Sequence, residues 1–195
     1  MIKRICVFSG SSPGLRPEYT QAAQDLAREI VARQWEVVYG GSHVGLMGVV
    51  ADAALRLGGW VIGVIPHVLV EKEVAHTELS ELRQVDSMHE RKAQMAALSD
   101  GFVALPGGFG TIEELFEVLT WVQLGIHGKP CGLLNVQGYF DHLIRFLDHT
   151  VQERFVRPAH RKTLLIDAAC RPLLDQFETY VAPQVSKLID RTPSA

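Results

Sequence analysis

The feature that most constrains the fold is a buried strand joined to an amphipathic helix by a glycine-rich turn. Residues 101–105 (GFVAL) form a short apolar run of the kind that a fully covered parallel strand needs. The turn at residues 106–110 (PGGFG) follows, and apolar residues then recur at helical spacing as far as Ile126. Such a turn leaves backbone N–H groups unpaired at the positive end of the helix dipole, so it favours an anion such as phosphate.

The spacing of this turn differs from that of the common nucleotide-binding loops. A dinucleotide fingerprint would require a third glycine at position 113, where the chain has Glu113. A Walker loop would require Gly-Lys followed by Ser or Thr, and the sequence has no such run. An ordinary tight turn is the alternative interpretation. The carboxylates of Glu113 and Glu114 in the first helical turn favour a site with chemistry attached.

Apolar runs and helical periods alternate along the whole chain. Strands are expected at residues 3–8, 35–39, 60–65, 81–86, 101–105, 130–135 and 164–166, with 81–86 at the periphery. Helices are expected at residues 17–34, from the loop 40–48 to about 58, and at 87–99, 111–126, 139–151 and 170–188. Residues 66–80 are expected to form a loop with at most one helical turn. This order predicts an α/β fold, a Rossmann-like doubly wound parallel sheet forming a single domain over residues 1–195, with ligands beyond the carboxyl ends of the strands.

Composition excludes several classes of function. The chain has 195 residues, 47% of them hydrophobic, which suffices for one core, and it has neither a membrane-spanning run nor a signal-peptide layout. Its three cysteines form no framework, so a reducing, cytoplasmic setting is expected. A net charge of −3 argues against binding nucleic acid. The eight histidines form no metal motif, so we expect no metal or other cofactor, and His43, His67, His76 and His89 are interpreted as polar surface residues.

The helix expected at residues 87–99 carries two cations where core residues belong. Met88, Met95 and Leu98 define its apolar arc, and Arg91 and Lys92 fall within or beside that arc. For Lys92, snorkelling and function are equally good explanations. For Arg91 we favour function, because an inward-facing guanidinium needs a planar anionic partner. The Ser-Met-His-Glu run at residues 87–90 fits a capping box.

A second glycine-rich loop, residues 10–14 (GSSPG), formally matches the nucleophile elbow of α/β hydrolases, with Ser12 as nucleophile. We reject this interpretation because the next residue is Pro13, which has no N–H group to serve the oxyanion hole. A phosphate or ribose contact from residues 9–12 and a plain turn remain the two alternatives.

Three motifs together resemble one known family. Residues 106–114 are similar to the PGGxGTxxE motif of the Lonely Guy family, cytokinin riboside 5'-monophosphate phosphoribohydrolases long mislabelled as lysine decarboxylases. Residues 88–92 (MHERK) resemble the family's second motif, and residues 39–48 (YGGSHVGLMG) a third. The likeness extends to about Arg161. One departure is Ser42, where the family usually has a third glycine.

The resemblance implies a Rossmann-like homodimer, with residues 117–125 near the contact. It implies hydrolysis of the N-glycosidic bond of adenosine-type 5'-monophosphates, such as cytokinin riboside 5'-monophosphate or AMP, to free base and ribose 5-phosphate. By position it makes Arg91 and Glu114 catalytic. The substrate contacts that it implies are Glu73, Arg91, Lys92, Gly107, Gly108, Phe109, Gly110, Thr111, Ile112, Glu113, Glu114 and Thr120. Glu73 and Thr120 rest on the family alone.

The chemistry of glycosidic bond cleavage agrees with this assignment. Breaking a ribosyl–base bond builds positive charge on the sugar, which a carboxylate at Glu114 can stabilise. Lysine decarboxylation fails, because pyridoxal phosphate needs a Schiff-base lysine beside a large pocket, and neither Lys92 nor Lys129 has that context. A non-catalytic nucleotide-binding or carrier protein and a nucleosidase with broad base specificity remain as alternatives.

Overall fold

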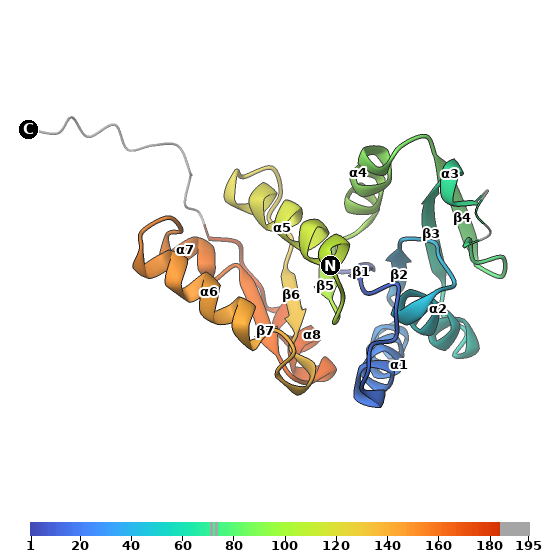
Figure 1. The fold of residues 1–195 in the computed structure, drawn as a ribbon, viewed down its shortest axis with the longest axis horizontal. Helices are drawn as coiled ribbons and strands as arrows, with labels where there is room; N and C mark the ends of the chain where they lie inside the picture. The colour runs from blue at the N-terminus through green and yellow to red at the C-terminus, as the bar shows by residue number, and fades with distance from the viewer. Residues whose placement is uncertain (71, 73, 184–195) are drawn as a thin grey trace, which may run out of the picture.

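The computed structural model describes residues 1–70, 72 and 74–183, and the strands within them form one parallel sheet (Figure 1). The strands follow the spatial order β4-β3-β2-β1-β5-β6-β7. Their bounds are β1 (Arg4–Phe8), β2 (Glu36–Tyr39), β3 (Val61–Pro66), β4 (Glu81–Val85), β5 (Gly101–Ala104), β6 (Cys131–Leu134) and β7 (Leu164–Asp167). Each of the seven expected strands is present, all are parallel, and β4 lies at an edge as predicted.

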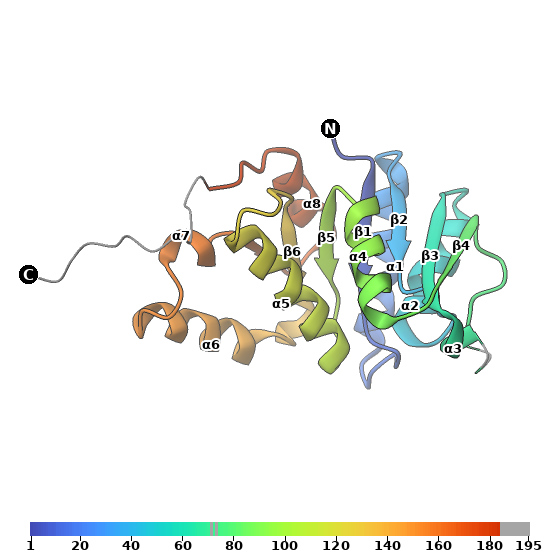
Figure 2. The same ribbon diagram turned by 90° about the horizontal axis from the view of Figure 1, so that it is seen from above.

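Helices cover both faces of this sheet. They are α1 (Pro17–Ala32), α2 (Gly45–Arg56), α3 (His67–Val70), α4 (Met88–Leu98), α5 (Phe109–Gln123), the 3₁₀ turn η1 (Val136–Gly138), α6 (Asp141–Gln152), α7 (Pro158–Arg161) and α8 (Cys170–Glu178). Helices α1, α2 and α8 pack on one face, while α4, α5 and α6 pack on the other. Figure 2 shows α4 and α5 in front of the sheet. This arrangement is the doubly wound fold that the alternation of elements predicted.

The two faces of β1 show how the sequence produces these layers. Ile5 and Val7 point into the core beneath α1 and α2, whereas Cys6 and Phe8 point into the core beneath α4 and α5. All four side chains are almost fully buried, as expected for a central parallel strand that is apolar on both sides. Successive side chains of the strand therefore anchor opposite helical layers.

The direction of winding changes between β1 and β5, which are neighbours in the sheet. The chain passes from β1 to α1 on one face and from β5 to α5 on the other, so the two loops separate at the carboxyl edge. They remain joined at their bases, where the Gly10 N–H donates to the Pro106 carbonyl oxygen at 3.1 Å. In doubly wound sheets this switch point is where ligands bind.

The last helix is shorter than predicted. It ends at Glu178 rather than near residue 188, and the described chain continues without regular structure to Pro183. Proline lacks the N–H group that a helix needs and disfavours helical geometry in the residue before it, so Pro183 explains why the helix stops short of it. The basic stretch at residues 157–162 contains the short helix α7, which sequence reasoning did not predict.

Candidate active site

Arg91 on α4 and Glu114 on α5 meet across the gap between the two helices. The guanidinium Nη1 lies 3.7 Å from the carboxylate Oε1, and each side chain is only about a tenth exposed. The N-terminus of α4 is set by Ser87, whose hydroxyl oxygen accepts a hydrogen bond from the Glu90 N–H. The capping box is incomplete, because the Glu90 carboxylate accepts from the Asp86 N–H instead of returning to Ser87.

Burial of this pair is energetically expensive and shapes its protonation. Removal from water raises the pKa of the Glu114 carboxyl above its ordinary value, and the Arg91 cation partly opposes that shift. The Arg91 guanidinium also donates from Nε to the Val64 carbonyl oxygen at 3.2 Å, and Nη1 contacts Met88 Sδ at 3.7 Å. Two buried, partly satisfied charges facing one another are typical of functional sites rather than of stabilising core.

Lys92 bridges the same two helices beside this pair. Its Nζ donates to Glu113 Oε1 at 2.5 Å and to Glu117 Oε1 at 3.2 Å. The hydrogen bond with Glu113, supported by Glu117, raises the pKa of Lys92, so the ammonium stays charged. Two cationic side chains, Arg91 and Lys92, therefore pair with three glutamates of α5, which are Glu113, Glu114 and Glu117.

The glycines of the turn before α5 differ in whether the packing of the fold requires them. A Cβ on Gly107 would lie 2.1 Å from Thr111 Oγ1 and 2.8 Å from the Gly10 nitrogen, so the packing of the two loops requires glycine there. A Cβ on Gly108 or Gly110 would meet nothing within 4 Å, and neither residue has a positive φ. The fold itself therefore does not demand glycine at these two positions. A ligand that approaches the backbone closely would require glycine at both positions.

A hollow of about 260 Å³ opens between the loops at the switch point. It is lined by residues 10–14 after β1, by residues 106–108, and by Tyr19, Leu46 and Tyr139. The Tyr139 hydroxyl donates to the Gly107 carbonyl oxygen at 2.7 Å, which ties the turn to the start of α6. Phe109, at the tip of the turn, is 96% exposed. Ser12 is exposed too, and its hydroxyl oxygen accepts from the Gly14 N–H, as in a plain turn.

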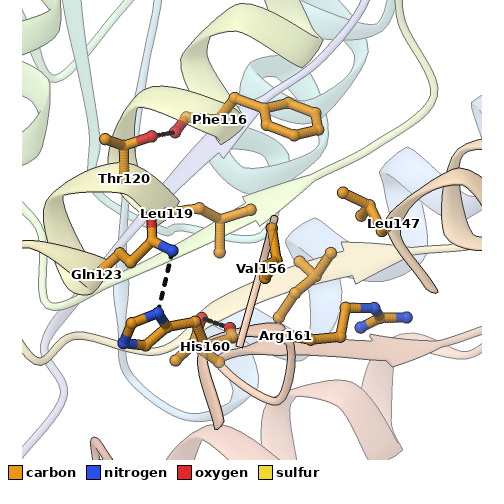
Figure 3. Close-up of a pocket in the computed structure, with 10 residues that line it drawn as sticks. Phe116, Leu119, Thr120, Gln123, Leu147, Val156, His160 and Arg161 are labelled. Carbon is orange, nitrogen blue, oxygen red and sulfur yellow. Dashed lines mark hydrogen bonds between the residues drawn. The ribbon is translucent and has the colours of Figure 1, made fainter. Parts of the chain in front are cut away.

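Thr120 is not part of the lining of the hollow at the switch point. It lines a separate apolar hollow of about 100 Å³ between α5, α6 and α7, which Figure 3 shows in close-up. Its hydroxyl donates to the Phe116 carbonyl oxygen at 2.7 Å, and Gln123 points across the hollow to His160, with 3.0 Å between Nε2 and Nδ1. Glu73 lies outside the described residues.

One of the four histidines interpreted as surface residues is buried. His43, His67 and His89 are exposed as predicted, but His76 is only 6% exposed, so its interpretation as a surface residue was wrong. Its Nε2 lies 2.9 Å from Asp52 Oδ1 on α2, and its Nδ1 accepts from the Glu78 N–H. This contact spans 24 residues and carries no periodic signal, which is why sequence reasoning missed it.

Ser42 takes part in the same loop contacts. Its hydroxyl donates to the Val74 carbonyl oxygen at 2.8 Å, and its backbone forms an isolated bridge with Ala75. The His43 N–H also donates to the Val74 carbonyl oxygen. The serine that replaces the usual glycine thus joins the loop after β2 to the segment before β4.

Comparison with known proteins identifies the family. A family model described as a possible lysine decarboxylase matches residues 47–177. A probable cytokinin riboside 5'-monophosphate phosphoribohydrolase of Oryza sativa subsp. japonica is 53% identical over 92% of this chain and 79% of its own. A cytokinin riboside 5'-monophosphate phosphoribohydrolase of Arabidopsis thaliana is 49% identical over 91% of this chain and 78% of its own. The chain belongs to the Lonely Guy family.

Solved structures similar to this Lonely Guy protein share its fold at low identity. The molybdenum cofactor binding protein of Rippkaea orientalis matches with a TM-score of 0.70 and 19% identity, over 92% of this chain and 97% of its own. A molybdenum cofactor carrier protein of Chlamydomonas reinhardtii matches with a TM-score of 0.70 and 20% identity, over 92% of this chain and 100% of its own. At this identity the likeness concerns the fold alone.

Metal-ligand groups and membrane-spanning helices are both absent from the described residues of the Lonely Guy protein. Within residues 1–70, 72 and 74–183, no three His, Cys, Asp or Glu side chains form a group that could hold a metal ion. Among the helices of the same ranges, none combines the length and apolar character that a bilayer span requires.

Proposed function

We propose that this protein hydrolyses the N-glycosidic bond of adenosine-type nucleoside 5'-monophosphates, cytokinin riboside 5'-monophosphate or AMP, giving free base and ribose 5-phosphate. The observation that carries the proposal is the buried Arg91–Glu114 pair, 3.7 Å apart, beside a glycine turn whose Gly108 and Gly110 have open space around them. About 50% identity to phosphoribohydrolases over nine-tenths of the chain supports the same reaction.

The geometry suggests a division of labour among the residues. The N–H groups of residues 108–111 lie at the positive end of α5 and would hold the 5'-phosphate, as helix N-termini hold anions. With the phosphate fixed, the ribose reaches the Arg91–Glu114 pair. As the bond from C1' to the base nitrogen breaks, positive charge develops on the sugar, and the Glu114 carboxylate stabilises it. Arg91 holds that carboxylate in position and favours its ionised form, because its charge opposes the effect of burial on the pKa of Glu114. The oxygen of a water molecule forms a bond to C1', and the proton that this water loses passes to the departing base, so the products are ribose 5-phosphate and free base.

The local charge supports this placement of the phosphate. Lys92 is already paired with Glu113 and Glu117, so the gap between α4 and α5 offers a phosphate few unengaged positive groups. In the described part of the chain, no carboxylate accepts a hydrogen bond from the N–H groups of residues 108–111. Lys92, Glu113 and Thr120 are proposed as contacts to the rest of the nucleotide, together with Glu73.

The test is product analysis. The protein is incubated with AMP and with isopentenyl-AMP, and base and ribose 5-phosphate are separated by chromatography. We expect equal amounts of both products from at least one nucleotide. Saturable binding with the nucleotide intact would contradict hydrolysis and favour a carrier protein.

The range of bases separates the remaining alternatives. An enzyme specific for adenine-type bases should cleave AMP or its isopentenyl derivative and leave GMP, CMP and UMP intact. Comparable rates on all four common nucleotides would instead identify a broad nucleotide nucleosidase. Comparable rates on AMP and isopentenyl-AMP would make AMP nucleosidase activity part of its function, beside a role in cytokinin biosynthesis.

We also propose that the chain works as a cytoplasmic homodimer in which residues 1–195 form one domain, without nucleic-acid or membrane partners. Three buried, unpaired thiols, Cys6, Cys131 and Cys170, support a reducing setting. The exposed apolar side chains of Leu124 and Ile126 at the end of α5 support a contact near residues 117–125.

A further inference from the structure

Gly40, the first residue after β2, leaves a space that the Arg91 guanidinium fills. A Cβ at this position would lie 1.7 Å from Arg91 Nη2 and 2.9 Å from its Cζ. Real Cβ contacts do not occur at such distances, so no residue with a side chain can coexist with Arg91 in its observed position. The φ of Gly40 is not in the left-handed region, so backbone conformation does not explain the glycine.

The other glycines of this loop have different explanations. Gly41 and Gly45 have φ values of +73° and +59°, which favour glycine whatever the surroundings. A Cβ on Gly48 would lie 2.0 Å from the His43 carbonyl oxygen, so the loop's own backbone excludes it. Among these four glycines, the requirement at Gly40 alone comes from a side chain of the proposed active site.

The contacts of Arg91 show what the missing side chain achieves. Nε donates to the Val64 carbonyl oxygen on β3, and Nη2 lies against the Gly40 backbone after β2. With Nε engaged by Val64 and Nη2 packed beside Gly40, the third nitrogen, Nη1, faces Glu114. The neighbouring strands β2 and β3 therefore both contribute to the position of the guanidinium, through Gly40 after β2 and Val64 within β3.

We propose that Gly40 is a positioning residue for Arg91: its lack of a side chain creates the slot that aims the guanidinium at Glu114. The inference rests on the proposed function, since it assigns to Gly40 the placement of a catalytic group. A methyl at position 40 would collide with the far end of a flexible side chain, not with backbone. The guanidinium would swing out of the slot while the strand stays in place, so turnover should fall with little loss of stability.

The test is a double-mutant cycle on AMP cleavage, with Gly40→Ala, Arg91→Ala and the double variant. We expect Gly40→Ala to lower kcat/KM at least ~10-fold in the wild-type background and less than ~2-fold in the Arg91→Ala background. A residue that merely supported the loop would give the same loss in both backgrounds. Thermal unfolding of each variant verifies that the fold persists.

Gly59→Ala is the matched control. A Cβ there would lie 2.4 Å from Val31 Cγ2, also a side-chain atom, and 3.0 Å from the Ala54 carbonyl oxygen, near the start of β3 at the opposite end of the strand from Val64. We expect the wild-type rate for this control. A wild-type rate for Gly40→Ala beside a slow Arg91→Ala would overturn this inference alone. A wild-type rate for Arg91→Ala would overturn the proposed role of Arg91, and this inference with it.

Discussion

Arg91 and Glu114 form a pair of opposite charges that α4 and α5 keep largely out of water. Glu114→Ala or Arg91→Ala should lower kcat for base release at least ~10²-fold, about 2.7 kcal/mol of barrier, because each removes charge stabilisation made in the transition state. Steady-state assays by chromatography, with circular dichroism to verify folding, measure this. Glu117→Gln, which alters a neighbouring carboxylate on the same helix, is the control and should retain far more activity. Folded variants of either residue that turn over at the wild-type rate would remove the catalytic assignment.

The pH dependence of activity tests the state of Glu114. Burial raises the pKa of this carboxyl above 4.5, with a further increase from the Glu113 carboxylate, while Arg91 and Lys92 lower it. If the ionised form is the active one, kcat/KM falls as pH drops through the raised pKa and is constant above it. The acid limb should therefore lie at higher pH than an ordinary glutamate would give.

A variant separates this limb from the titration of the substrate phosphate, whose second pKa is about 6. Glu113→Gln removes a charge that raises the pKa of Glu114, so the enzyme's limb should move to lower pH, while the substrate's titration is unchanged. A pH–rate profile of both proteins with AMP decides this. A limb at the same pH in both would assign it to the phosphate.

At the scale of the element, the turn into α5 makes a prediction about its glycines. Gly108→Ala and Gly110→Ala should leave the melting temperature within a few degrees of wild type, because a Cβ meets nothing within 4 Å at either position. They should weaken AMP binding at least ~10-fold, since the methyl would stand where the phosphate approaches the backbone. Calorimetric titration in a Glu114→Gln background measures this affinity without turnover.

Gly107→Ala is the contrasting variant and should lower stability, because its methyl would press against Thr111 and Gly10. If Gly108→Ala and Gly110→Ala both bind AMP with unchanged affinity, the phosphate does not bind at this turn.

Helices α4, α5 and α8 show which structural features can be predicted from residues that are close together in the sequence. The period of α5 and the cap at Ser87 could be predicted, because both depend on residues within a few positions of one another. The inward position of Arg91 could be predicted from the arc of α4. Its fit against Gly40 and the pairing of His76 with Asp52 could not, since they join residues 51 and 24 positions apart through the packing of different elements. The end of α8 at Glu178 was missed because apolar spacing continues past the point where the helix stops.

At the scale of the whole molecule, the alternation of strands and helices predicted the class of fold but not the strand order. Parallel pairing follows from the helical crossovers, whereas the position of the winding change depends on which face each crossover takes. That choice brings α4 and α5 side by side and hence Arg91 to Glu114. Arg91 and Glu114 could each be identified as candidates from the sequence, and the resemblance to the family assigned both to one active site. Only the folded arrangement explains why side chains 23 positions apart meet.

The proposed homodimer can be tested through the end of α5. Leu124 and Ile126 are 53% and 65% exposed, and burying them against a second copy would remove apolar surface from water. Sedimentation of the wild type should give twice the chain mass of 21.6 kDa. The double variant Leu124→Glu/Ile126→Glu should sediment as a monomer, because the contact would have to bury four like charges, two from each chain. Leu57→Glu, at a residue 50% exposed beyond α2, is the matched control and should remain dimeric. A wild type that sediments as a monomer would end the dimer proposal, and a double variant that stays dimeric would move the contact elsewhere on the surface.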